Sequence, residues 1–273
     1  MKIFIKYSFF IVFCSYTAFS QDTIKALANA KYKLTHHYDT LNYNNVYFEN
    51  YLSIIYPNEI IFKSIDKELQ DSAIKLNYRK TGIMMPVSNE KYNDEILILN
   101  KQKQQMYTTT SKLIGDYLVE RLYPNMNWKI KAEKKIIIGY KCQKATVSFR
   151  GRDYTAWFTD ELPFKSGLGK FNGLPGLIIL LEDDTKRIKY ELNSFTTSGN
   201  LIKKDNVKRE VIDWDKYEKL VSFLMNDPYG FLAQRIGRKI NSDTPPKPMT
   251  RNPLLPKKAI NFPLEAQEFY LKK

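Results

Sequence analysis

"NWKIKAEKKIIIGYKCQKATVSFRGRDYTAWFTDELP", residues 127–163, is the stretch that decides the fold class. Polar and apolar residues alternate through it in short runs rich in β-branched and aromatic side chains, a pattern typical of half-buried strands. Gly151-Arg152 predicts a tight turn between two of the runs, because glycine adopts a positive φ without steric cost. Pro163 ends the last run. The stretch therefore predicts three or four successive strands.

The flanking sequence continues this pattern on both sides. Further strands are predicted over residues 31–40 and 50–65, with a strand pair over 95–110 and a hairpin that joins 177–183 to 187–195. Pro57-Asn58 divides the second of these runs into a hairpin, and apolar residues at helical spacing predict a short helix over 66–79. Many short strands with short turns, and no alternation of strand and helix, predict a mainly β fold. We expect a curved antiparallel sheet or an incomplete barrel.

The pattern changes after about residue 208. Asp213 is suited to cap a helix with one apolar face, and Asp227-Pro228 predicts the cap and first position of a second helix ending near Ile240. Residues 241–273 hold six of the chain's twelve prolines and an excess of basic residues. We therefore expect a β-rich domain over 21–208, a helical appendage over 209–240 and a basic, Pro-rich tail.

The first twenty residues predict export. Lys2 and Lys6 precede an apolar run over 7–19, and Ala18 and Ser20 are the small residues that signal peptidase requires. A membrane anchor is the alternative, but the run is shorter than the roughly 20 apolar residues that span a bilayer. We predict a signal peptide over 1–20 and a product in the periplasm, at the outer membrane or secreted.

Removal of the signal peptide leaves Cys142 as the one cysteine, so stability must come from a hydrophobic core and not from an internal disulfide. The formal charge is +14. Scattered basic residues in an exported protein match anionic envelope surfaces, such as lipid headgroups, better than nucleic acid. A basic, solvated surface without a specific partner is the alternative. No segment after the signal peptide is long enough to span a membrane.

Few residues have the spacing of a catalytic or metal site. His36 and His37 are adjacent, so on a strand they point to opposite faces and cannot share one metal ion. Cys142 lies within a predicted strand without a base nearby in sequence, which favours a small buried side chain over a nucleophile. The carboxylate pairs fall in predicted turns, where aspartate is favoured for its hydrogen bonds to the backbone: Asp160-Glu161 and Asp183-Asp184. We expect neither metal nor cofactor.

"KFNGLPGLIIL", residues 170–180, predicts a structural corner rather than a phosphate-binding loop. Pro175 lacks a backbone N–H, and β-branched residues follow it in place of a helix. We expect a type II turn in which Pro175 fixes φ and Gly176 takes a positive φ. Gly173 is expected to allow close backbone packing against the preceding strand. The strand that follows should be buried on both faces.

Residues 139–183 resemble the signature of the GLPGLI family, which takes its name from this hexapeptide. Residues 51–72 also resemble the family's early strands, so the likeness covers roughly 28–196. The family consists of exported proteins known mainly from Gram-negative bacteria, and its function is uncharacterised. One departure is Leu168, where the family pattern leads us to expect "GP" before Lys-Phe.

The resemblance implies that "GRDYTAWFT" and "KFNGLPGLI" form one structural unit, with five residues converging near the 163–173 loop: Arg152, Tyr154, Trp157, Lys170 and Phe171. Tyr154 and Trp157 alternate to opposite faces of a strand, so one of them at most points into a pocket. Trp157 beside Lys170 would form an apolar wall with a cationic edge, suited to an amphiphile with an anionic group. The alternative is that these residues are core aromatics and surface charges.

Three functions are consistent with the sequence. The first is a non-enzymatic envelope protein that binds an apolar or amphipathic ligand, such as a lipid, in the concavity of its sheet. The second is a protein-interaction component of outer-membrane transport or surface assembly, with the tail as its contact. The third is an unrecognised enzyme acting on envelope polymers, which would require clustered titratable groups.

Overall fold

The computed structural model describes residues 26–39, 42–82, 92–110, 114–165, 168–197 and 209–237. The predicted signal peptide and Pro-rich tail lie outside these residues. Among the described residues, no helix combines the length and the hydropathy needed to cross a membrane.

The described residues form twelve strands and three helices. The strands are β1 (Ala28–His37), β2 (Val46–Ile55), β3 (Glu59–Ser64), β4 (Leu97–Asn100), β5 (Gln105–Thr109), β6 (Tyr117–Arg121), β7 (Lys129–Ile137), β8 (Tyr140–Phe149), β9 (Arg152–Thr159), β10 (Leu177–Asp183), β11 (Ile188–Thr197) and β12 (Glu210–Ile212). The helices are α1 (Ile65–Thr81), α2 (Trp214–Asn226) and α3 (Pro228–Ile236).

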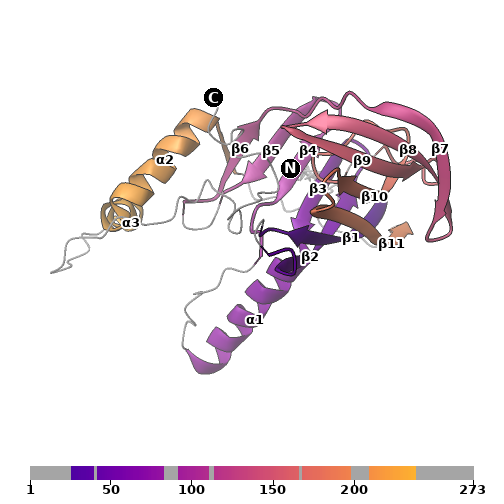
Figure 1. The fold of residues 1–273 in the computed structure, drawn as a ribbon. Helices are drawn as coiled ribbons and strands as arrows, with labels where there is room; N and C mark the ends of the chain where they lie inside the picture. The colour runs from indigo at the N-terminus through magenta and orange to yellow at the C-terminus, as the bar shows by residue number, and fades with distance from the viewer. Residues whose placement is uncertain are drawn as a thin grey trace, which may run out of the picture.

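All twelve strands join one curved, unclosed sheet, which confirms the predicted fold class (Figure 1). The strand order is β12-β6-β5-β4-β3-β2-β1-β11-β10-β9-β8-β7, and neighbours are antiparallel except for the parallel pair β12 and β6. Among the described strands, the sheet therefore has two free edges, β12 at one end and β7 at the other. Sequence patterns predicted neither β6 nor β12.

Residues 127–163, the stretch that decided the fold class, contain the three strands β7, β8 and β9. Arg150 and Gly151 occupy the turn between β8 and β9, with φ of 51° and 78°. Positive φ at both central residues is the geometry of a two-residue type I′ hairpin turn. The turn lies one residue earlier than the sequence predicted, because Arg152 already belongs to β9.

The main core lies on the concave face, where side chains from distant strands meet. Tyr51 of β2 and Tyr154 of β9 belong to the same buried cluster. Alanine occupies four fully buried positions of this cluster: Ala28, Ala30, Ala145 and Ala156. The concave face is also filled by residues 168–176, which we call the plug segment and which contribute buried Leu168 and Leu174.

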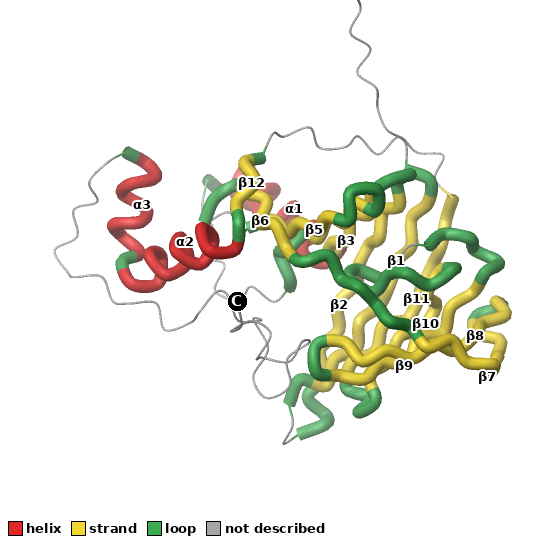
Figure 2. Tube along the Cα trace, turned by 90° about the horizontal axis from the view of Figure 1, so that it is seen from above, coloured by secondary structure: helices red, strands yellow, loops and turns green. Residues whose placement is uncertain are grey.

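The helices lie apart from this core. The pair α2–α3 packs against β6 at one end of the sheet through Val221, Leu224 and Phe231, far from the β7 edge (Figure 2). Asp213 accepts a hydrogen bond from Lys216 N at 2.7 Å and Asp227 accepts one from Gly230 N at 2.8 Å, so both predicted caps are confirmed.

Two details of the helices differ from the sequence prediction or go beyond it. Helix α3 ends at Ile236, where Gly237 takes a φ of 64°, and therefore ends before the predicted Ile240. Helix α1, predicted over 66–79, is confirmed but buries no residue and projects away from the sheet (Figure 1). Its start is capped by the Ser64 side chain, which accepts a hydrogen bond from Lys67 N at 3.0 Å.

Candidate functional site

The corner over residues 173–176, which precedes β10, is built differently from the type II turn that the sequence predicted. Gly173 has the positive φ, at 94°, whereas Gly176 does not lie in the left-handed region. A Cβ on Gly176 would lie 1.9 Å from the carbonyl oxygen of Thr159, so this position requires glycine for close backbone packing. The predicted roles of the two glycines are therefore exchanged. The strand that follows is buried on both faces at Leu177, Ile178 and Ile179, as predicted.

The plug segment crosses the concave face between distant strands. Phe171 packs edge-on against Tyr154 of β9, with ring centroids 4.7 Å apart. At the other side, Gly169 lies so close to the Phe62 ring of β3 that an added Cβ would approach it to 3.2 Å. The segment is held in place by Trp128, whose indole Nε1 donates a hydrogen bond to the Asn172 carbonyl oxygen at 2.8 Å. These contacts make the segment part of the core.

The five predicted ligand-binding residues divide between two faces of the sheet. Tyr154 and Phe171 meet in the core on the concave side. Trp157 lies on the opposite face of β9, because side chains alternate along a strand. The cation beside Trp157 is Lys135 of β7, whose Nζ lies 4.0 Å from the centroid of the indole ring. Lys170 belongs to the plug segment, next to Phe171.

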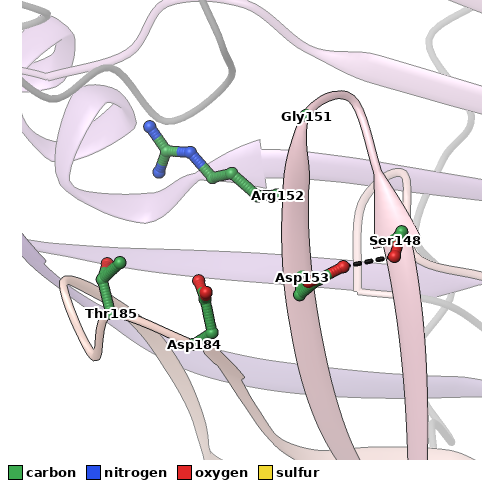
Figure 3. Close-up of a pocket in the computed structure, with 6 residues that line it drawn as sticks. All are labelled: Ser148, Gly151, Arg152, Asp153, Asp184 and Thr185. Carbon is green, nitrogen blue, oxygen red and sulfur yellow. Dashed lines mark hydrogen bonds between the residues drawn. The ribbon is translucent and has the colours of Figure 1, made fainter.

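Arg152, the remaining predicted residue, lines a hollow of about 470 Å³ at the rim of the sheet (Figure 3). The hollow lies where the β8–β9 and β10–β11 turns meet, and the Asp184 amide donates a hydrogen bond to the Asp153 carbonyl oxygen at 3.0 Å. The Ser148 hydroxyl donates a hydrogen bond to the Asp153 carboxylate. The Arg152 side chain points away from this pair (Figure 3).

The carboxylate pair Asp183-Asp184 serves the β10–β11 turn in part, as the sequence predicted. Asp183 is buried, and its carboxylate accepts hydrogen bonds from the Ile188 amide at 2.7 Å and from the Thr185 hydroxyl. These bonds close the turn, so Asp183 has a structural explanation.

His36 and His37 lie in β1 and Cys142 lies in β8, so all three residues lie on strands, as the sequence predicted. His36 is buried, whereas His37 stacks on the exposed ring of Tyr43, with centroids 3.8 Å apart. Within the described ranges, no group of three or more potential metal ligands comes together. Cys142 is buried, and burial raises the pKa of its thiol, which disfavours the reactive thiolate.

Sequence reasoning missed a buried carboxylate, Glu49 of β2, which is only 1% exposed. It accepts hydrogen bonds from the hydroxyls of Tyr47 at 2.7 Å and Tyr51 at 2.6 Å, and from the Asn93 amide at 2.8 Å. Alternation of Tyr47, Glu49 and Tyr51 on one strand face was the available signal. Because three donors satisfy the carboxylate, Glu49 holds the Asn93 segment to the sheet.

A cationic surface was also missed, along the free edge formed by β7. All residues of β7 except Ile137 are exposed, and lysine occupies four of its nine positions: Lys129, Lys131, Lys134 and Lys135. Glu133 is the one acidic residue of β7 and forms an ion pair with Lys144 of β8 at 2.8 Å. We call β7, β8 and their turn the edge hairpin.

Residues 149–180 match a family model. The family is described as a protein of unknown function (Porph_ging), and the matched residues cover β9, the plug segment and the first part of β10. No curated protein matches the chain. The match therefore coincides with the corner and plug that close the concave face.

Among solved structures, the chain is similar to two crystal forms of PNGF-II. The form in space group P21 is 15% identical, with a TM-score of 0.49, over 71% of this chain and 33% of that chain. The form in space group C2 is 12% identical, with a TM-score of 0.47, over 71% of this chain and 32% of that chain. This chain thus matches about a third of the length of PNGF-II.

Proposed function

We propose that the chain is a GLPGLI-family protein that is exported to the cell envelope and binds an amphipathic ligand with an anionic group. The observation that carries this proposal is the placement of Lys135 over Trp157. This pair places a cation on an aromatic ring, so that apolar surface and positive charge lie together, as such a ligand requires. The cation comes from the edge hairpin, in place of Lys170 of the plug segment.

The neighbours of Trp157 support the same chemistry. Leu180 of β10 and Lys144 of β8 flank it in the register of the sheet. An apolar chain could therefore lie on Trp157 and Leu180 while its anionic group accepts charge-assisted hydrogen bonds from Lys135 and Lys144. The partner of Lys144, Glu133, is well exposed, so exchanging that ion pair for a ligand would cost little.

The location of the ligand differs from the concavity that the sequence suggested. In the described part of the chain, the plug segment fills the concave face with Leu168, Phe171 and Leu174. A ligand there would have to displace these side chains from the core, whereas on the opposite face the exposed Lys135 side chain would have to move from the Trp157 ring. We therefore favour the face that carries Trp157.

Binding of dodecyl phosphate to the chain from Gln21 onward, measured by isothermal titration calorimetry, tests the proposal. Lys135→Gln should weaken binding about tenfold, because a hydrogen bond to a charged group is lost. Lys170→Gln is the matched control and should bind as the unchanged chain does. Equal affinities for the unchanged chain and Lys135→Gln would refute the site.

The second candidate is a protein-interaction role in transport or surface assembly, and α1 is the observation that favours it. Leu69 and Leu76 are exposed on a helix that buries no residue. Leu69→Ser with Leu76→Ser, and separately deletion of residues 241–273, should abolish a partner complex while dodecyl phosphate still binds. Loss of dodecyl phosphate binding together with the complex would contradict a separate interaction surface.

A further inference from the structure

The turn of the edge hairpin carries an isoleucine where its backbone favours asparagine. Ile138 and Gly139 form the two-residue turn between β7 and β8, with φ of 43° and 89°. Asn-Gly is the preferred pair for such a turn, and a β-branched residue is strained at positive φ. The Ile138 side chain is 60% exposed, so packing within the described residues offsets little of that strain.

Ile138 is part of a larger exposed apolar group on the same hairpin. Ile136 is 72% exposed, and Ile130 is also exposed at the other end of β7. Lysines surround the tip: Lys134 and Lys135 precede it and Lys141 follows it in the register opposite Ile136. An exposed apolar tip with a cationic surround matches the boundary between acyl chains and anionic headgroups of a membrane.

The geometry of the edge argues against backbone pairing with another strand. The register between β7 and β8 shifts between Ile130, which pairs with Ala145, and Lys134, which pairs with Gln143. Four residues along β7 therefore correspond to two along β8. A bulge and lysines on an edge strand are the devices by which proteins prevent edge-to-edge pairing. The hairpin is therefore suited to contact a partner through its side chains.

We infer that the edge hairpin binds the surface of an anionic lipid bilayer, with Ile136 and Ile138 inserted among the headgroups and Lys134 and Lys141 paired with lipid phosphates. The inference deepens the proposed function, since it makes a bilayer the source of the anionic amphiphile. It uses different side chains from the Trp157 site. Figure 1 shows the hairpin at the free edge of the sheet.

Co-sedimentation with vesicles tests this inference on the chain from Gln21 onward. Vesicles of three parts phosphatidylcholine to one part phosphatidylglycerol should bind the chain, and pure phosphatidylcholine vesicles should bind it much less. Ile136→Ser with Ile138→Asn should reduce the bound fraction at matched lipid about tenfold, because apolar burial at the membrane is lost. Leu122→Ser, which changes a residue 79% exposed and outside the hairpin, is the control and should have no effect.

The choice of asparagine separates binding from folding. Asn tolerates the left-handed region, so Ile138→Asn should keep or raise the melting temperature. Loss of vesicle binding would then reflect the lost apolar tip. A double variant that sediments with vesicles like the unchanged chain would overturn the inference, and so would equal binding to the two kinds of vesicle.

Salt and the short-chain probe separate this inference from the proposed function. Raising NaCl from about 0.1 M to about 1 M shortens the Debye length from about 10 Å to about 3 Å. The chain should therefore dissociate from the vesicles. The double variant should still bind dodecyl phosphate, since Lys135 and Trp157 are intact. If dodecyl phosphate does not bind but the isoleucine-dependent binding of vesicles persists, the Trp157 site fails and the hairpin inference stands.

Discussion

Gly173 and Gly176 show how two glycines in one corner serve different physical needs. Gly173 permits a φ of 94°, and Gly176 permits the close approach of the Thr159 carbonyl. The sequence predicted a corner here but exchanged the two roles. A turn type can be inferred from local residues, whereas a close approach depends on a strand that returns from elsewhere, so no local pattern reports it.

Gly176→Ala should destabilise the fold more than an alanine at an open glycine position. Its Cβ would meet Thr159 backbone at 1.9 Å, which the chain can relieve only by moving β9 or β10. We expect a loss of about 3 kcal/mol in the free energy of unfolding. Gly82→Ala is the control, with no atom within 4 Å of the added Cβ, and its φ of 68° should cost about 1 kcal/mol. Equal midpoints in urea for the two variants would contradict the close approach.

Cys142 should be unreactive in the native chain. Burial shields the sulfur and raises the pKa of the thiol, so both access and thiolate are reduced. Iodoacetamide should label Cys142 in the chain from Gln21 onward only after urea is added, as measured by mass spectrometry. Ser148→Cys places a thiol at an exposed position and should be labelled without urea. Rapid native labelling of Cys142 would show that the site opens.

At the scale of elements, the sequence predicted the strands and helices that have a local signal, such as alternation, turn residues or a helix cap. The hairpins of β2–β3, β4–β5 and β10–β11 have alternation and turn residues, and α2 and α3 have aspartate caps. The missed strands β6 and β12 are five and three residues long and pair in parallel across a separation of 93 positions, as Glu210 with Tyr117. Such short runs carry too little periodicity to distinguish a strand from a loop.

Substitutions in α1 should have little effect on stability, in contrast to those in the plug segment. Leu76 is exposed on a helix that buries no residue, so Leu76→Ala should change the free energy of unfolding by about 0.5 kcal/mol or less. Leu174 is buried in the main core, and Leu174→Ala should cost about 2–5 kcal/mol. Urea denaturation of the two variants measures the difference. A large cost at Leu76 would show that α1 is packed against another part of the chain.

At the scale of the whole molecule, the candidate site depends on how the strands are ordered in the sheet. Alternation along β9 predicted that Tyr154 and Trp157 separate, and they do. Closeness in sequence suggested Lys170 as the cation, but the sheet brings Lys135 of β7 over Trp157, two strands from β9. A register across three strands, with a bulge in one of them, is not encoded in any single stretch.

The concave core should also make the whole fold sensitive to alkali. Tyr32 and Tyr51 are buried in it, and burial raises the pKa of both hydroxyls above that of an exposed tyrosine. The unfolded chain ionises these groups near pH 10, while the folded chain keeps them protonated. The stability they contribute is therefore fully present below about pH 10 and is lost as pH rises further. Above about pH 10, each buried tyrosine should lower the free energy of unfolding by about 1.4 kcal/mol per pH unit.

Tyr32→Phe provides the decisive comparison. The Tyr32 hydroxyl donates a hydrogen bond to the Ile178 carbonyl oxygen at 2.9 Å, so the variant should lose about 1 kcal/mol at pH 8. Above about pH 10 the stability of the variant should fall less steeply than that of the unchanged chain. The two slopes should differ by about 1.4 kcal/mol per pH unit, because the variant has one ionising group fewer. Urea midpoints from pH 8 to about pH 11 test this slope. Parallel pH dependences would mean that Tyr32 reaches solvent, and that the plugged concave face opens without global unfolding.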